Sequence, residues 1–112
     1  MSTIPKVDQS TNAVTLPPPN ERKRPLFPLG QVVATPAALA HFNEHRIQPA
    51  EYIRRHQCGD WGDVPTEDAG ENDFSVLHGL RVLSSYEIAA QRVWIITEAD
   101  RSSTTLLFPS EY

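Results

Sequence analysis

Acidic side chains are concentrated in one short segment of this 112-residue chain, where they could bind a cation. Between His56 and Asp73 there are six acids and no Lys or Arg: Asp60, Asp63, Glu67, Asp68, Glu71 and Asp73. Carboxylate oxygens are the ligands that hard cations such as Mg²⁺ and Ca²⁺ prefer. The acids do not follow the alternating spacing of an EF-hand loop. The interpretation that needs no ligand is that they serve a helix N-terminus and the protein surface.

A second group of polar side chains follows the most apolar stretch of the sequence. Val93–Ile96 is an unbroken apolar run, and soon after it come Glu98, Asp100, Arg101 and Ser102. Turns at strand ends display polar groups on a rigid base, and two carboxylates beside an arginine could act as acid and base. The alternative is an Asp–Arg pair and an Asx-turn that hold a hairpin in register. One site built from both groups requires Gly59–Asp63 and Glu98–Ser102 to lie side by side.

The sequence lacks the best-known catalytic motifs. Cys58, the only cysteine, is two residues from His56, and residues two apart on a helix do not face each other. GxSxG, HExxH, CxxC, Walker A and GxGxxG patterns are absent. We therefore expect no cofactor. A single cysteine excludes an internal disulfide and is typical of a reducing, cytoplasmic compartment.

A single α+β domain is expected to position these groups. Leu29–Ala34 predicts a short strand, and the helix-start signals at Pro36, Pro49 and Pro65 predict three short helices. A three-stranded antiparallel meander is then predicted from the alternating residues of Val82–Ile88, the apolar run in Val93–Thr97 and the β-prone residues of Thr104–Phe108. Between the second and third helices, the glycines of Gly59–Asp63 predict a tight turn with Trp61 packed on the core.

Composition divides the chain near residue 28. Residues 1–28 hold six of the ten prolines and few large apolar residues, which predicts a disordered Pro-rich tail before a domain at residues 29–112. The tail has four basic and two acidic residues, whereas the domain has six arginines and twelve acids, so the net charges are +2 and −6. Such an acidic domain is a poor partner for nucleic acid. We expect neither secretion nor membrane insertion, because no leader or long apolar run is present.

Three segments and the C-terminus resemble a family of small bacterial proteins met on plasmids and other mobile elements. The segments are Leu29–Pro36, Gly59–Asp63 and Trp94–Thr105, and the chain closes on Pro109–Tyr112. Members of this family are described as plasmid-related proteins or, by analogy, as restriction–modification subunits. The resemblance covers Leu29–Tyr112 and implies no established activity and no catalytic residue.

Two functions from different classes fit these observations. The first is a small acidic interaction protein of a mobile element that binds a host or plasmid protein, for instance one involved in defence. The alternative is a small metal-dependent hydrolase or nuclease that uses Gly59–Asp73 and Glu98–Ser102. For both functions the candidate binding residues are Asp60, Trp61, Asp63, Asp68, Glu98, Asp100, Arg101 and Ser102.

Two further interactions are considered, from the helices and from the strand edges. A helix-turn-helix formed by the first two helices would place Arg54 and Arg55 on the second helix, but the acidity of the domain argues against DNA binding. An exposed strand edge, at Leu29–Ala34 or at Thr104–Phe108, would allow two copies of the chain to pair.

Overall fold

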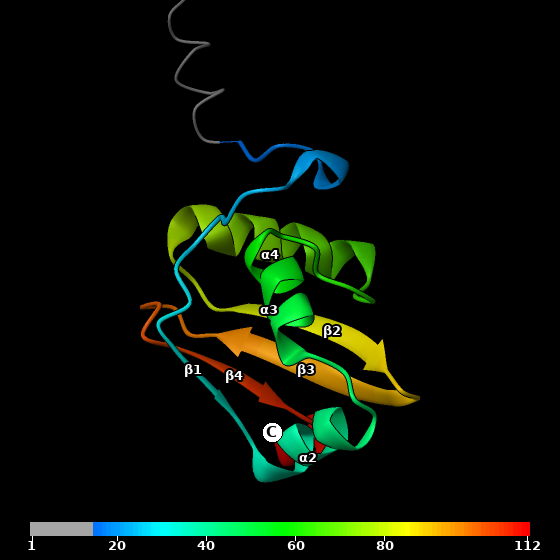
Figure 1. The fold of residues 1–112 in the computed structure, drawn as a ribbon. Coiled ribbons are helices and arrows are strands. Elements are labelled where there is room, and N and C mark those ends of the chain that lie inside the picture. Colours follow the sequence, from blue (N-terminus) through cyan, green and yellow to red (C-terminus); the bar gives the residue numbers. More distant parts are fainter. Residues whose placement is uncertain (1–14) are drawn as a thin grey trace, which may run out of the picture.

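The computed structural model describes residues 15–112, which form three helices and one sheet (Figure 1). The elements in chain order are a 3₁₀ turn η1 (Pro19–Glu21), β1 (Gln31–Ala34), α2 (Pro36–Glu44), α3 (Pro49–Gln57), α4 (Thr66–His78), β2 (Val82–Ile88), β3 (Gln91–Thr97), β4 (Ser103–Leu107) and a 3₁₀ turn η2 (Pro109–Glu111). The α+β class and the order of strand, three helices and three strands are those predicted from the sequence.

The helix boundaries follow local signals in the sequence. Thr35 caps α2, because its hydroxyl accepts a hydrogen bond from the backbone N–H of Ala38, and Pro36 occupies the first helical position. Helix α3 also has a proline, Pro49, at its first position, but its N-cap residue Gln48 makes no side-chain capping bond. Gly79 ends α4 in the left-handed conformation, with a φ of 67°.

The sheet has four strands in the order β1-β4-β3-β2. The strands β2, β3 and β4 form the predicted antiparallel meander, with Val82 opposite Thr97 and Thr97 opposite Thr104. The expectation of a purely antiparallel three-stranded sheet is wrong, because β1 joins the sheet in parallel with β4. A parallel pair needs a long connection, and the chain between β1 and β4 contains the three helices and the β2–β3 hairpin. The strand β4 is therefore interior, and of the two strands considered for self-pairing only β1 lies at an edge.

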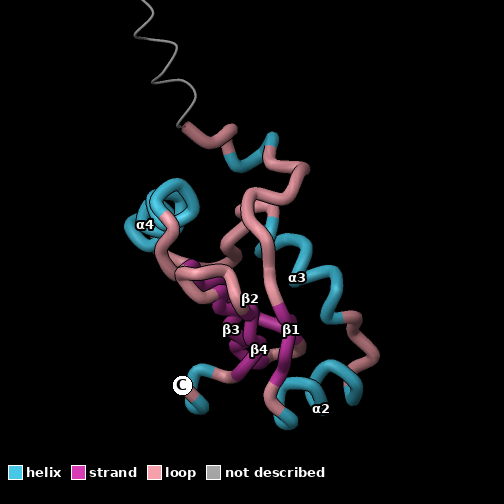
Figure 2. Tube along the Cα trace, turned by 90° about the vertical axis from the view of Figure 1, so that its left-hand side faces the viewer, coloured by secondary structure: helices cyan, strands magenta, loops and turns pink. Residues whose placement is uncertain are grey.

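Helices α2 and α3 lie together on one face of the sheet (Figure 2), whereas α4 lies beside the edge strand β2, where the Asn72 side chain bonds the backbone C=O and N–H of Leu83. The first face is packed around six residues that are at most 2% exposed: Phe42, Tyr86, Ile88, Val93, Ile95 and Leu106. Trp94 points to the opposite face, where its ring meets that of Tyr112 with 5.8 Å between centroids. The apolar run in β3 thus contributes to both faces, as a central strand should.

Part of the segment expected to be a tail packs on the domain. Phe27 is only 5% exposed and lies in a second apolar cluster with Trp61 and Val82. Leu26 donates its backbone N–H to the carbonyl of Gln57 at 2.8 Å. Packing therefore begins before Leu29, whereas residues 1–14 of the expected tail lie outside the described residues.

None of the helices within residues 15–112 combines the length and the apolar composition needed to cross a bilayer.

Candidate functional site

The turn Gly59–Asp63 fixes Trp61 in the core, as its sequence predicts. The indole is 5% exposed, stacks on Phe27 with 6.2 Å between centroids, and meets the edge of His56 at 5.9 Å. Gly62 has a φ of 76°, and any side chain there would collide with the carbonyl of Ser85. Trp61 is therefore a packing residue whose only polar group, Nε1–H, is used inside the protein.

The two carboxylates of this turn have separate basic partners. Asp60 accepts a hydrogen bond from Arg55 at 2.7 Å, and Asp63 accepts one from Arg92 at 3.1 Å. Both acids are at least half exposed, so each ion pair contributes little to stability. Each carboxylate thus faces a different arginine, and neither belongs to a group of three potential metal ligands within residues 15–112.

A groove beside the turn is closed by an ion pair that holds the N-terminal segment. Arg22 donates two hydrogen bonds to Asp73, at 2.9 and 3.0 Å, and a third to the carbonyl of Gly59. Trp61 Nε1–H also donates to Asp73, at 3.0 Å. The adjoining hollow has a volume of about 620 Å³, and Arg54 and the buried free thiol of Cys58 are among its lining residues.

The turn between β3 and β4 is held by hydrogen bonds within the protein. The Arg101 guanidinium donates to four backbone carbonyls, which belong to Ser75, Leu80, Glu98 and Ala99. Asp100 accepts hydrogen bonds from the side chain and backbone of Ser102, and these bonds lower the pKa of its carboxyl group. The bond from the Ser102 backbone to Asp100 agrees with the Asx-turn considered for this hairpin, whereas Arg101 bonds backbone carbonyls and forms no ion pair with Asp100 within residues 15–112.

The two candidate segments are not brought together as one ligand set. Among the described residues, the acids of Gly59–Asp73 and of Glu98–Ser102 have different partners and do not gather as three potential metal ligands. Asp68 is exposed in the first turn of α4, where its charge suits the positive end of the helix dipole.

A row of four fully buried polar side chains, linked by hydrogen bonds, crosses the core beneath α3. His56 contacts the Ser84 hydroxyl at 2.6 Å through Nδ1 and the Thr97 hydroxyl at 2.9 Å through Nε2. Thr97 contacts Thr104 at 2.6 Å, and Thr104 donates to the carbonyl of Leu29 at 2.7 Å. The four side chains in this row have no exposed surface, so each of them needs a hydrogen-bond partner inside the protein.

The donor and acceptor of each hydrogen bond in this row follow from the carbonyl of Leu29, at which the row ends. The Leu29 carbonyl only accepts, so Thr104 donates to it and must accept from Thr97. Thr97 then accepts from His56 Nε2–H, which leaves Nδ1 to accept from Ser84. Only a neutral imidazole satisfies this order. Burial and the charge of Arg101 favour the same form, because they lower the pKa of His56 to about 3.

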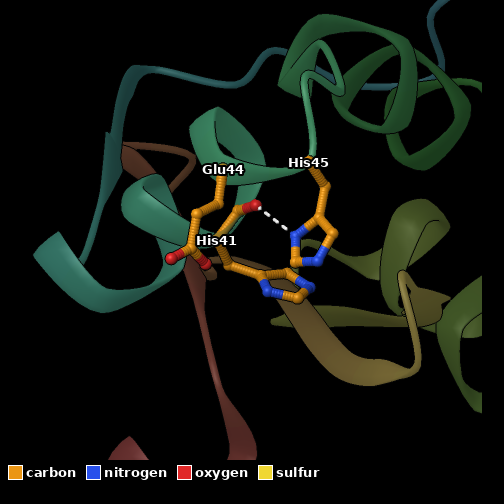
Figure 3. Close-up of side chains that lie close together, drawn as sticks. All are labelled: His41, Glu44 and His45. Atoms are coloured by element: carbon orange, nitrogen blue, oxygen red, sulfur yellow. Dashed lines mark hydrogen bonds between the residues drawn. The ribbon is translucent and has the colours of Figure 1, made fainter.

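A cluster that the sequence reasoning missed lies at the end of α2 (Figure 3). One potential ligand atom from each of His41, Glu44 and His45 lies within 4.8 Å of the other two. Figure 3 shows the imidazole of His41 between the Glu44 carboxylate and the His45 ring. The signal was present in the sequence as His-x-x-Glu-His, since residues three and four apart share a helix face.

Comparisons of this chain with protein-family models, with curated proteins and with solved structures found no match.

Proposed function

We propose that this chain is a binding protein, and that it docks a basic, partly apolar segment of another protein on the outer face of α4. In keeping with the sequence resemblance, we place the partner among proteins of a bacterial host or of a mobile element. The observation that carries the proposal is an exposed apolar surface bordered by acids that have no basic partner within the described chain.

Large apolar side chains are exposed on and just after α4. Phe74 is 55% exposed, Leu77 42% and Leu80 46%, so none of these side chains is buried in the core of the domain. A hollow of about 520 Å³ lies between Phe74 and Leu80, and Gly70 lies at its border. Nothing within 4 Å would meet a Cβ at Gly70, so this part of the helix is open. Exposed apolar surface of this kind is a feature of protein-binding sites.

The acids beside this hollow favour a basic partner. Glu67 and Glu71 line it, are exposed, and form no ion pair within residues 15–112. They are four residues apart on the helix, a spacing at which like charges destabilise by about 0.2–0.5 kcal/mol. The helix dipole compensates Glu67 in the first turn but not Glu71 in the second. A cationic segment would relieve this repulsion, and its apolar side chains would cover Phe74.

Charge reversal tests this proposal. We expect a Glu67→Lys/Glu71→Lys variant to lose a partner that co-purifies with the wild-type chain from cells carrying its gene. Glu51→Lys is the matched control, because Glu51 lies in the first turn of α3 as Glu67 does in α4. Retention of the same partner by the double variant, or its equal loss from the Glu51 control, would contradict docking on α4.

A further inference from the structure

We infer that His41, Glu44 and His45 form a binding site for a first-row divalent transition ion of the Zn²⁺ class. Two imidazoles and one carboxylate suit such ions, whereas Mg²⁺ and Ca²⁺ prefer oxygen ligands alone. Figure 1 shows α2 and α4 at opposite ends of the sheet, so this site is separate from the proposed docking surface.

The hydrogen bonds of the two histidines fix which nitrogen is free. His41 Nε2 lies 2.7 Å from the carbonyl of Ile88, and His45 Nδ1 lies 3.0 Å from the carbonyl of His41. A carbonyl only accepts, so both of these nitrogens carry hydrogen in the neutral rings. The lone pairs are then on His41 Nδ1 and His45 Nε2, which have no hydrogen-bond partner among the described residues. Metal-binding histidines are commonly oriented in this way by a backbone carbonyl.

Burial and charge support the same assignment. His41 is only 8% exposed, so its free nitrogen is largely shielded from bulk water, while Glu44 and His45 are exposed and open the cluster to solvent. Glu44 forms no ion pair within residues 15–112. The cluster also lies at the C-terminal end of α2, where the helix dipole favours a cation.

The spacing of the three ligand atoms fits one ion after a small closure. Ligands at about 2.0–2.1 Å from a tetrahedral ion are about 3.3 Å apart, and one nitrogen or carboxylate oxygen from each of the three side chains lies within 4.8 Å of the other two. Small torsional changes in the exposed side chains of Glu44 and His45 close this difference. Three protein ligands leave a fourth position for water or for a group from a partner.

Titration calorimetry with Zn²⁺ on the full, tag-free chain tests the site. We expect one ion per chain and no binding of Mg²⁺. His45→Ala should lower the affinity for Zn²⁺ at least about tenfold, because loss of groups that only orient a ligand already costs 10–100-fold. Glu44→Gln should lower it as well. The exposed His78, in the last turn of α4, provides the matched control His78→Ala, whose affinity should equal that of the wild type.

Several outcomes would overturn the inference. These are the absence of binding by the wild-type chain, an unchanged affinity in His45→Ala, an equal loss in His78→Ala, or equal binding of Mg²⁺. Unchanged affinity in Glu44→Gln would also overturn it, because the ion would then rest on a histidine pair alone. Circular dichroism of each variant shows that the fold is retained, and Zn²⁺ should raise the melting temperature of the wild type but not that of His45→Ala.

Discussion

Acidification should destabilise this fold through the imidazole of His56, which has no exposed surface. Burial and the nearby charge of Arg101 lower its pKa from 6.5 to about 3 in the folded protein, whereas in the unfolded chain it titrates near its ordinary value. The unfolded state therefore binds the proton at the higher pH. The stability that neutral His56 contributes is complete above pH 6.5 and is lost as the pH falls toward 3.

The size of this pH effect follows from the one proton that His56 binds in the unfolded state but not in the folded state. The free energy of unfolding should fall by about 1.4 kcal/mol per pH unit in this window, or about 3 kcal/mol between pH 6.5 and 4. A small domain is stabilised by only about 5–15 kcal/mol in total. The structural reason is that protonated Nδ1 can no longer accept from Ser84, while Nε2 still has to donate to Thr97.

Urea unfolding, followed by tryptophan fluorescence from pH 8 to 4, measures this dependence in wild type and in His56→Gln. We expect the variant to be about 1–3 kcal/mol less stable at pH 7 and to lose the His56 part of the pH dependence, so that the two curves converge on acidification. His78→Gln, at an exposed position, should run parallel to the wild type. Parallel curves for His56→Gln, or an NMR titration of the wild-type His56 ring near pH 6, would refute the reasoning.

Three further predictions concern stability, and urea unfolding measures each of them. Gly70→Ala should stabilise the chain by about 0.5–1 kcal/mol because the new Cβ meets nothing, whereas Gly79→Ala should destabilise it by about 1 kcal/mol at its φ of 67°; equal effects would contradict the helix assignment. Asp73→Asn should cost about 2 kcal/mol and expose residues 15–28 to proteases, since it leaves the Arg22 guanidinium buried without its counter-ion; an unchanged cleavage pattern would contradict this. Arg101→Lys should cost about 1–3 kcal/mol, because one ammonium cannot reach all four carbonyls; a neutral effect would show that these bonds do not hold the turn.

Signals that act within a few residues allowed much of this fold to be predicted. The N-cap at Thr35, the proline at Pro49 and the left-handed Gly79 each report on one turn of chain, and they mark helix ends correctly. The meander was equally accessible, because its strands are close in sequence. The parallel pairing of β1 with β4 was not, since it joins segments about 70 residues apart and leaves no local pattern.

The candidate sites were harder to predict because their chemistry depends on distant partners. Asp60 and Asp100 looked like free ligands, but the structure gives them Arg55 and Ser102 as partners. The reverse holds for His41, whose spacing to Glu44 was visible in the sequence although the carbonyl that orients its ring comes from Ile88 on another element.

Photo-crosslinking from α4 tests the central proposal most directly. A photoreactive phenylalanine analogue at Phe74, which is 55% exposed, should capture a second protein in cells, and the same analogue at Leu39 on α2, which is 45% exposed, should not. The product should disappear when Glu67 and Glu71 are changed to Lys. Absence of a product from position 74, a product equally abundant from position 39, or one formed only between two copies of this chain would contradict docking of a basic partner on α4.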